Sequence, residues 1–273
     1  MKDLECVELE TNPRELAAFV VAKKDEKIVG VSSKLKHEPS ALEAIVRGLH
    51  SANIAIKHVV MSEREDGNGW LFNAVLDMSK SAEGTAGLEA FLKRLDCVEQ
   101  LSISDQGNVL HQTSLFPIMN RKDRVIFQSV TRLQYIRDQL EKILTPSGLS
   151  VIFYNMGVVG GRGTHTMFTH QFQADLLTVK QRMSLFRDHF ISGGMGVFDF
   201  TDLDLESRSG LVKIFDDYEC EGIRKKSPVC HTARGILAGF LSSEWSTRVR
   251  VVELMCRAMG DPHCEFGVAV GEV

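Results

Sequence analysis

The sequence predicts an α+β protein built from two domains. Its 273 residues suit one large or two ordinary domains. Strand-like alternation and helix-like spacing of apolar residues take turns over the first hundred positions, and a second set of such segments follows residue 120. Between the two sets, residues 106–119 contain Gly and Pro and lack clear periodicity. We therefore predict a domain over residues 1–105, a linker over 106–119 and a second domain over 120–273.

Composition and charge narrow the class of protein. Hydrophobic residues make up 44% of the chain and charged residues 25%, close to the average for soluble globular proteins. The apolar run Leu16–Ala22 is far shorter than the roughly 20 residues that span a bilayer. The opening MKDLECVELE is acidic and lacks the apolar centre of a secretory signal. These features predict a cytoplasmic protein that does not bind membranes.

The charge balance argues against direct binding of nucleic acid. The formal net charge is −4, and neither half of the chain is basic. A protein that neutralises many phosphates needs a face rich in Lys and Arg. We also find no helix-turn-helix pattern and no basic helix, so no direct nucleic-acid partner is expected.

The first domain is predicted from six segments. Strands are expected where β-branched and apolar residues alternate, and helices where one face is apolar. In chain order these are a strand at 27–35, a helix at 39–53, a strand at 54–62, a strand at 70–78, a helix at 84–95 and a strand at 98–104. A turn at 65–69 joins the middle strands. The order βαββαβ is the ferredoxin-like arrangement. Residues 16–22 add a strand ahead of it or form an arm packed on a partner.

Part of this domain resembles the ACT domain family. The resemblance rests on Pro39-Ser40-Ala41-Leu42 after a strand, and on Asn53-Ile54 at the start of the next strand. It covers roughly residues 27–105. ACT domains usually carry Asp where His37 stands and Gly where Ser40 stands. The resemblance implies a ferredoxin-like fold and a role in regulation and dimerisation.

The second domain is predicted to be mixed α/β. A long amphipathic helix is expected at 121–144, because apolar residues recur at helical spacing from Ile126 to Ile143. Thr145-Pro146-Ser147-Gly148 is expected to end it. Further along, a helix is predicted at 231–244, a strand at 248–256, a turn at 260–262 and a strand at 264–270.

Cysteines gather near the end of the chain: four of six lie in the last 54 residues. The turn between Cys256 and Cys264 would bring these thiols together, and Cys230 at the start of the preceding helix could reach the same point. Three thiolates and one carboxylate suit a closed tetrahedral zinc site. Glu253 is the fourth candidate, with His231 and His263 as alternatives.

Two difficulties accompany the zinc prediction. On an ideal strand Glu253 and Cys256 point to opposite faces, so a bulge or an irregular strand end is needed. The alternative is that these thiols are buried small hydrophobic groups, which free cysteines often are. Cys6, Cys97 and Cys220 have no clear partner in the sequence and are interpreted as structural.

The same region resembles the 4-vinyl reductase (4VR) domain family. That family usually ends with Cys, a Gly-containing helix, Glu-x-x-Cys, Gly-Asp and Cys-x-Phe. The corresponding residues here are Cys230, Gly235, Gly239, Glu253, Cys256, Gly260, Asp261, Cys264 and Phe266. Upstream, Tyr154-Asn155-Met156-Gly157 and Gly160-Gly161 match a glycine-bearing helix of the family, so the resemblance covers roughly residues 120–270.

The resemblance implies a dimeric α/β domain that encloses an apolar pocket. The family includes sensor domains that respond to aromatic hydrocarbons, a protein of bacteriochlorophyll synthesis and vesicle-tethering subunits. In the sensors, a structural zinc is held at positions that match Cys230, Glu253, Cys256 and Cys264. These four residues are therefore the predicted metal ligands.

Aromatic and apolar residues supply candidates for the ligand pocket, although ordinary core packing explains each of them equally well. The candidates are Phe127, Tyr135, Tyr154, Phe168, His170, Phe172, Phe186, Phe190, Ile236 and Val251. Gly157–Gly163 lacks the spacing of a phosphate loop, and close helix packing or a helix end explains its glycines better. We interpret the acidic run from Asp216 to Glu221 as a solvated strand edge or turn.

The leading functional hypothesis is a ligand-sensing regulatory protein that carries structural zinc. It would bind a small apolar or aromatic molecule, form a homodimer and act through a separate output partner. An enzyme is not favoured, because no nicotinamide or flavin fingerprint is present. The alternatives are a tetrapyrrole-related vinyl reductase or accessory protein, a protein–protein scaffold, and a metal-free thiol switch.

Overall fold

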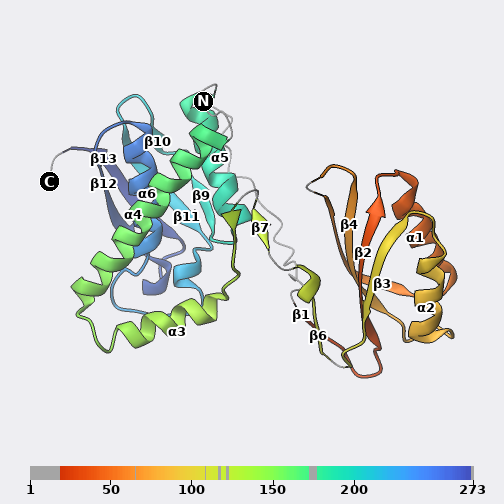
Figure 1. Cartoon of the computed structure of the whole chain (residues 1–273). Helices are drawn as coiled ribbons and strands as arrows, with labels where there is room; N and C mark the ends of the chain where they lie inside the picture. Colours follow the sequence, from red (N-terminus) through yellow and green to blue (C-terminus); the bar gives the residue numbers. More distant parts are fainter. Residues whose placement is uncertain are drawn as a thin grey trace. The chain divides into compact units, whose positions relative to one another are not determined.

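The chain divides between Ile126 and Phe127 into two units, which are described separately (Figure 1). The computed structural model describes residues 19–271, apart from residues 65, 108, 116–117, 121–122 and 172–176. Cys6 and Phe172 lie outside the described residues. Within the described ranges, no helix combines the length and the hydropathy needed to cross a membrane.

The first unit has the predicted order of elements. These are β1 (Phe19–Val21), β2 (Ile28–Lys36), α1 (Ser40–Ser51), β3 (Ala55–Glu63), β4 (Gly69–Asp77), α2 (Gly84–Lys93), β5 (Val98–Ser104), β6 (Val109–His111), η1 (Thr113–Leu115), β7 (Met119–Asn120) and β8 (Asp123–Arg124). Four strands form an antiparallel sheet in the order β3-β4-β2-β5. The two central strands, β2 and β4, are thus separated in sequence by a helix and an edge strand.

The core of this unit lies between the sheet and its two helices. Helix α1 buries Ala41, Ile45 and Leu49, which recur every four residues and so share one face. The two helices approach closely, because a Cβ on Gly48 would lie 1.7 Å from the ring of Phe91. Beside the helix entry, His37 stacks on Trp70 with ring centroids 5.1 Å apart.

A short strand pair extends the first unit. Strand β1 pairs antiparallel with β6, so Phe19–Val21 does add a strand to this unit. Val20 and Leu110 are buried there with Ile28 and Val75 of the main sheet. Strand β6 lies in the stretch predicted as a linker, where three residues were too few to show a period.

The second unit is mixed α/β, as predicted. Its elements are α3 (Val130–Leu140), α4 (Pro146–Gln171), α5 (Val179–Ser192), β9 (Val197–Asp199), β10 (Leu203–Asp204), β11 (Ser209–Phe215), η3 (Tyr218–Cys220), α6 (His231–Glu244), β12 (Val249–Met255), η4 (Arg257–Met259) and β13 (Cys264–Val270). The sheet runs β10-β11-β13-β12, and β9 also pairs with β11. Figure 1 shows α4 crossing α6, which packs on strand β12.

Glycines allow α4 and α6 to touch backbone to backbone. A Cβ on Gly161 would lie 2.0 Å from the carbonyl oxygen of Ile236, and one on Gly235 would lie 2.1 Å from that of Tyr154. Gly157 and Gly239 are equally tight. The interpretation of Gly157–Gly163 as a close-packing helix is therefore confirmed.

The prediction of one helix over 121–144 is wrong at its start. Strand β8 occupies Asp123–Arg124, and α3 begins only at Val130. The hydroxyl of Ser129 accepts a hydrogen bond from Arg132 N and so caps the helix there. The prediction for residues 145–148 is also wrong, since Pro146 opens α4 and Thr145 Oγ1 accepts from Gly148 N. Proline suits a first helical turn as well as a helix end.

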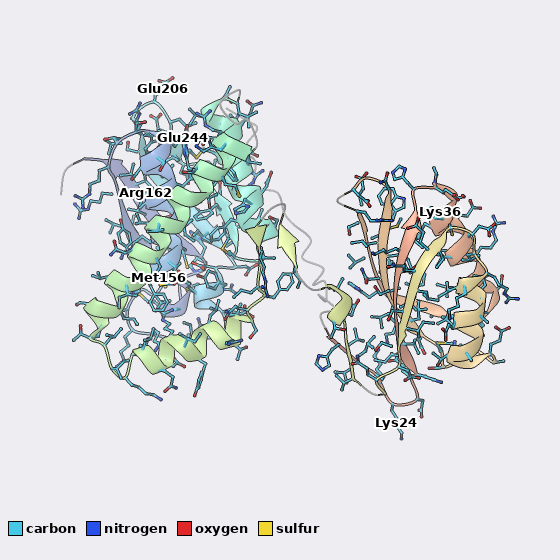
Figure 2. All side chains as sticks on the ribbon, in the orientation of Figure 1. Lys24, Lys36, Met156, Arg162, Glu206 and Glu244 are labelled. Atoms are coloured by element: carbon cyan, nitrogen blue, oxygen red, sulfur yellow. The ribbon has the colours of Figure 1, made fainter. Side chains whose placement is uncertain are left out.

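Two side-chain groups hold the helices of the second unit together. Several phenylalanines pack in the core, with Phe186 stacked on Phe240 at a centroid distance of 4.1 Å. Glu244, labelled in Figure 2, is 1% exposed and receives two hydrogen bonds from Arg182, at 2.8 and 2.5 Å. His165 Nε2 lies 3.3 Å from the same carboxylate. This network joins α4, α5 and α6.

Candidate metal centre

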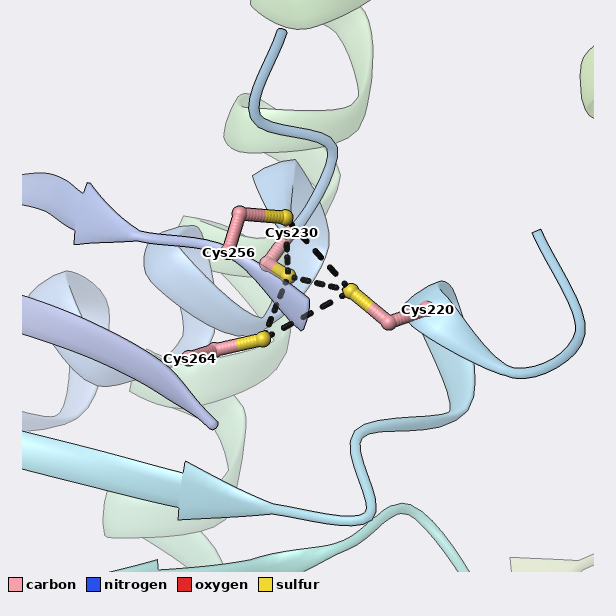
Figure 3. Close-up of side chains that lie close together, drawn as sticks. All are labelled: Cys220, Cys230, Cys256 and Cys264. Atoms are coloured by element: carbon pink, nitrogen blue, oxygen red, sulfur yellow. Dashed lines mark hydrogen bonds between the residues drawn. The ribbon is translucent and has the colours of Figure 1, made fainter. Parts of the chain in front are cut away.

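Four buried thiols converge in the second unit (Figure 3). Cys220, Cys230, Cys256 and Cys264 have Sγ atoms that all lie within 4.8 Å of one another. The Sγ of Cys220 lies 3.1 Å from Cys230, 3.6 Å from Cys256 and 3.5 Å from Cys264. The Sγ of Cys230 lies 3.8 Å from Cys256 and 3.3 Å from Cys264.

Four separate segments supply these thiols. Cys220 ends η3, and Cys230 is the N-cap residue of α6. Cys256 follows β12, and Cys264 is the first residue of β13. The hairpin is held shut at this end, because the Asp261 carboxylate accepts a hydrogen bond from Cys256 N at 2.8 Å. The structure thus brings together three of the four predicted ligands.

Glu253 lies beside the cluster. The pairing of β12 with β13 shifts register between Glu253 and Met255, which is the strand irregularity that the sequence required. Glu253 Oε1 accepts from Cys230 N at 3.4 Å, and Oε2 is buried without a hydrogen-bond partner among the described residues. Burial, followed by the negative charge of Cys256, raises the pKa of Glu253 to about 9.

Cys220 is the functional residue that sequence reasoning missed. Its interpretation as a structural cysteine without a partner is wrong, because its thiol contacts all three others. Its position depends on the fold of η3, and the motif of the resemblance begins only at Cys230. The alternatives His231 and His263 point elsewhere: His231 Nδ1 lies 3.4 Å from Ser150 Oγ, and His263 Nε2 lies 3.8 Å from Glu265.

The acidic run before Cys220 is not a solvated edge. Asp217 and Glu219 are buried, and that part of the prediction is wrong. Glu219 caps α6 by accepting hydrogen bonds from Thr232 N at 3.2 Å and Ala233 N at 2.8 Å. Burial raises the pKa of Glu219 to about 8, and the neighbouring Asp217 adds to this shift. Asp217 Oδ1 accepts from Glu219 N at 3.0 Å and so fixes the turn of η3.

The electrostatics of the thiols favour a shared negative charge. Hydrogen bonding with Cys220 lowers the pKa of Cys256 and raises the pKa of Cys230. One thiolate is thus stabilised by neutral thiols around it. A cation bound among these sulfurs would displace the remaining protons, since only thiolates are metal ligands.

The cluster fits a tetrahedral metal ion. Four thiolates bound to zinc at about 2.3 Å would place their sulfurs about 3.8 Å apart. The five distances given above run from 3.1 to 3.8 Å, so small outward movements would suffice. A hydrogen bond from Arg257 N to Cys264 Sγ, at 3.4 Å, would further stabilise a thiolate. These residues could therefore hold a metal ion.

The predicted ligand-pocket residues do not converge on one site. Phe127, Tyr135 and His170 are exposed. Phe168, Phe186, Phe190 and Val251 are buried in the core. Ile236 packs at the glycine contact of α4 and α6. Tyr154 stacks under the guanidinium of Arg234, 4.8 Å from its ring centre, and lines a groove of about 580 Å³ with Arg162 and Arg248.

Comparison with known proteins agrees with part of this picture. Residues 211–270 match the family model of the 4-vinyl reductase (4VR) domain. This segment contains all four cysteines, and the 4VR resemblance is confirmed for this region. No match of this kind supports the ACT resemblance, so the assignment of the first unit stays a proposal.

Two archaeal sequences and two solved structures are similar to the chain. The protein MJ0855 of Methanocaldococcus jannaschii is 26% identical over 200 residues, which are 70% of this chain and 77% of that protein. MJ1642 of the same organism is 29% identical over 58 residues, 21% of this chain and 36% of that protein. The phenol-responsive sensory domain of the transcription activator PoxR, solved with phenol, has a TM-score of 0.48 and 19% identity, covering 54% of this chain and 77% of that one. A vinyl-4-reductase family protein from M. jannaschii has a TM-score of 0.37 and 18% identity, covering 56% and 86%.

Proposed function

We propose that this is a ligand-sensing regulatory protein whose second unit is a 4VR-type domain built around structural zinc. The observation that carries the proposal is the convergence of four buried thiols inside the segment that matches the 4VR domain. Zinc is the metal expected for four thiolates in a tetrahedral arrangement.

Bound zinc would act here as a crosslink. Four protein ligands leave no open coordination position, so it would supply no reaction site for a substrate. The ligands Cys220, Cys230, Cys256 and Cys264 would join η3, the start of α6 and both strands of the β12–β13 hairpin. Each of these segments also borders the phenylalanine core, and the metal would therefore stabilise the walls of the domain.

The sensed molecule is proposed to be small and apolar or aromatic. The 4VR match supports this, since the family includes sensors of aromatic hydrocarbons. The phenylalanine core supplies the matching chemistry, with Phe168, Phe186 and Phe240 in edge and stacked contacts. A ligand would enter by displacing some of these rings, or would occupy the groove beside Tyr154.

The first unit is proposed to be a ferredoxin-like, ACT-type module that forms a homodimer. Its strand order β3-β4-β2-β5, with a helix before β3 and another before β5, supports this assignment. In this proposal the ligand-bound state of the second unit passes through the dimer to a separate output partner.

Elemental analysis of the purified, chelator-washed protein tests the metal site. We expect about one zinc per chain, and its loss in a Cys256→Ser/Cys264→Ser variant. A Cys97→Ser variant is the matched control, because Cys97 is buried in the first unit and should leave the metal content unchanged. Wild-type protein with no metal and four reactive thiols would contradict the proposal and favour a redox switch. The 3.1 Å contact of Cys220 with Cys230 would then mark the first disulfide to form.

A thermal-shift screen tests the ligand separately. Phenol, other single-ring aromatics and short-chain fatty acids are added to the zinc-loaded protein. A saturable rise in the unfolding temperature identifies a ligand, because binding to the native state alone stabilises it. A flat response over the whole panel would remove the sensing role and leave a scaffold.

A further inference from the structure

Helix α3 is attached to the second unit in an unusual way. Its one buried residue is Arg137, which is 8% exposed, whereas Tyr135 is 65% exposed and Leu133 and Ile136 also face solvent. A helix usually docks through a buried apolar face. Here the contact depends on a single guanidinium and on polar groups around it.

The partners of α3 lie in one short segment of chain, residues 219–229. Arg137 Nη1 donates to the carbonyl oxygen of Glu219 at 3.5 Å, and Nη2 donates to that of Val229 at 3.0 Å. Gln134 Nε2 donates to the carbonyl oxygen of Glu221 at 2.5 Å. One turn later, Glu141 pairs with Lys225 at 2.7 Å. The position of α3 therefore follows the shape of this segment.

The two carbonyls that Arg137 binds stand directly before metal-ligand candidates. Glu219 precedes Cys220, and Val229 precedes Cys230. The 3.1 Å contact between these two thiols closes residues 220–230 into a loop, and Arg137 spans its neck. From this geometry we infer that metal binding at the four thiols controls the docking of helix α3. This inference rests on the proposed metal site.

Cys220 is the ligand that links the metal to the loop. The other three thiols stand on α6 and the β12–β13 hairpin, which hold their places through the core. Glu253 Oε2 is buried beside them without a partner among the described residues, so it can supply the fourth donor when Cys220 leaves. The site thus has five donors for four positions, and exchange of Cys220 for Glu253 frees the loop while the metal stays bound.

A second anchor sets how far the loop can open. Glu219 binds the N-terminus of α6 through Thr232 N and Ala233 N whether or not the metal is present. The neck therefore opens mainly at Cys220 itself, and the contact that weakens is that of Arg137 with both carbonyls at once. Release of α3 would expose the guanidinium and free the chain between Phe127 and Pro146, which leads out of the first unit.

Hydrogen exchange on the full chain, followed by mass spectrometry, tests the inference. The metal content of every sample is measured alongside. Chelation of the wild type should speed exchange in residues 130–140 by tenfold or more, with less change in α6 and none in β4. Unchanged exchange in α3 after the metal has been removed would overturn the inference. So would equal loss of protection in α3, α6 and β13, because that pattern is unfolding of the whole unit.

Two variants separate the loop from the metal. In Cys220→Ser, with Glu253 as replacement ligand, α3 should exchange fast while metal remains; slow exchange in that state contradicts the inference. In Arg137→Met, metal content should stay at the wild-type level, α3 should exchange fast, and chelation should produce no further change in α3. A wild type that contains no metal and takes up none from added zinc defeats the proposed function itself, and does so before any exchange is measured.

Discussion

Arg137 Nη2 donates a hydrogen bond to the carbonyl oxygen of Val229 across 92 positions of sequence, at a distance of 3.0 Å. The acceptor is the residue before Cys230, so a helix near the start of the second unit is held by the backbone of the thiol cluster. Removing an interaction inside this cluster should therefore be felt far from it. The following predictions address the metal, the helix contact, the buried ion pair and a buried histidine.

Metal removal should destabilise the second unit selectively. Zinc at a free concentration a thousand times its Kd adds about 4 kcal/mol of stability to the state that binds it. For a unit of this size, that corresponds to roughly 8–16 °C in Tm. Differential scanning calorimetry with and without chelator should show one transition move and the other stay. Two transitions that move together, or neither moving, would contradict the assignment.

The α4–α6 contact should not tolerate a methyl group. In Gly161→Ala the new Cβ would lie 2.0 Å from a backbone carbonyl oxygen, which cannot move aside as a flexible side chain can. We expect a loss of at least about 1–3 kcal/mol in unfolding free energy, measured by urea denaturation. Gly163→Ala in the same helix is the control, since no atom lies within 4 Å of its added Cβ. The control should be neutral or stabilising by up to about 1 kcal/mol.

The ion pair between Arg182 and Glu244 should matter more than a surface pair. Arg182→Met leaves the buried Glu244 carboxylate with His165 as its remaining charged neighbour, so we expect a loss of about 3 kcal/mol, the lower end for breaking a buried pair. Lys213→Met, which breaks the exposed pair with Asp202, should cost less than about 1 kcal/mol. Equal losses in the two variants, measured by urea denaturation, would show that burial does not set the strength of the Arg182 pair.

His189 should make stability fall on acidification. Burial lowers its pKa below the ordinary value of 6.5, so the unfolded chain binds a proton that the folded chain does not. Its contribution is fully present above about pH 6.5 and is lost as the pH falls through and below that value. Comparing urea midpoints at pH 7.5 and 5.5, we expect a smaller fall in His189→Gln than in the wild type. The metal site is common to both proteins, and identical falls would refute the assignment to His189.

The elements with strong local patterns could be read from the sequence. The βαββαβ order follows from alternation and helical spacing, and the predicted bounds of α6 and β13 match those observed. The 121–144 helix failed because apolar spacing says nothing about a competing cap, and Ser129 provides one. Pro146 was assigned to a helix end because proline is common at both ends of helices.

The candidate site was partly predictable for a similar reason. Cys256 and Cys264 meet because a hairpin is a local structure, and Cys230 meets them because it starts the next helix upstream. Cys220 reaches the cluster only because Asp217 turns the chain and Glu219 caps α6, contacts that link separate segments. Periodicity and spacing carry no information about such contacts.

The spread of the four thiols along the chain has a consequence for biosynthesis. The site cannot close until Cys264 has left the ribosome, whereas the first unit is complete at Ile126. At roughly 5–20 residues per second, the interval between these two events is about 7 to 28 s. During that time Cys220 and Cys230 are exposed without their later partners. The order of translation thus makes the nascent second unit the stage at which thiol oxidation or scarcity of metal would do most harm.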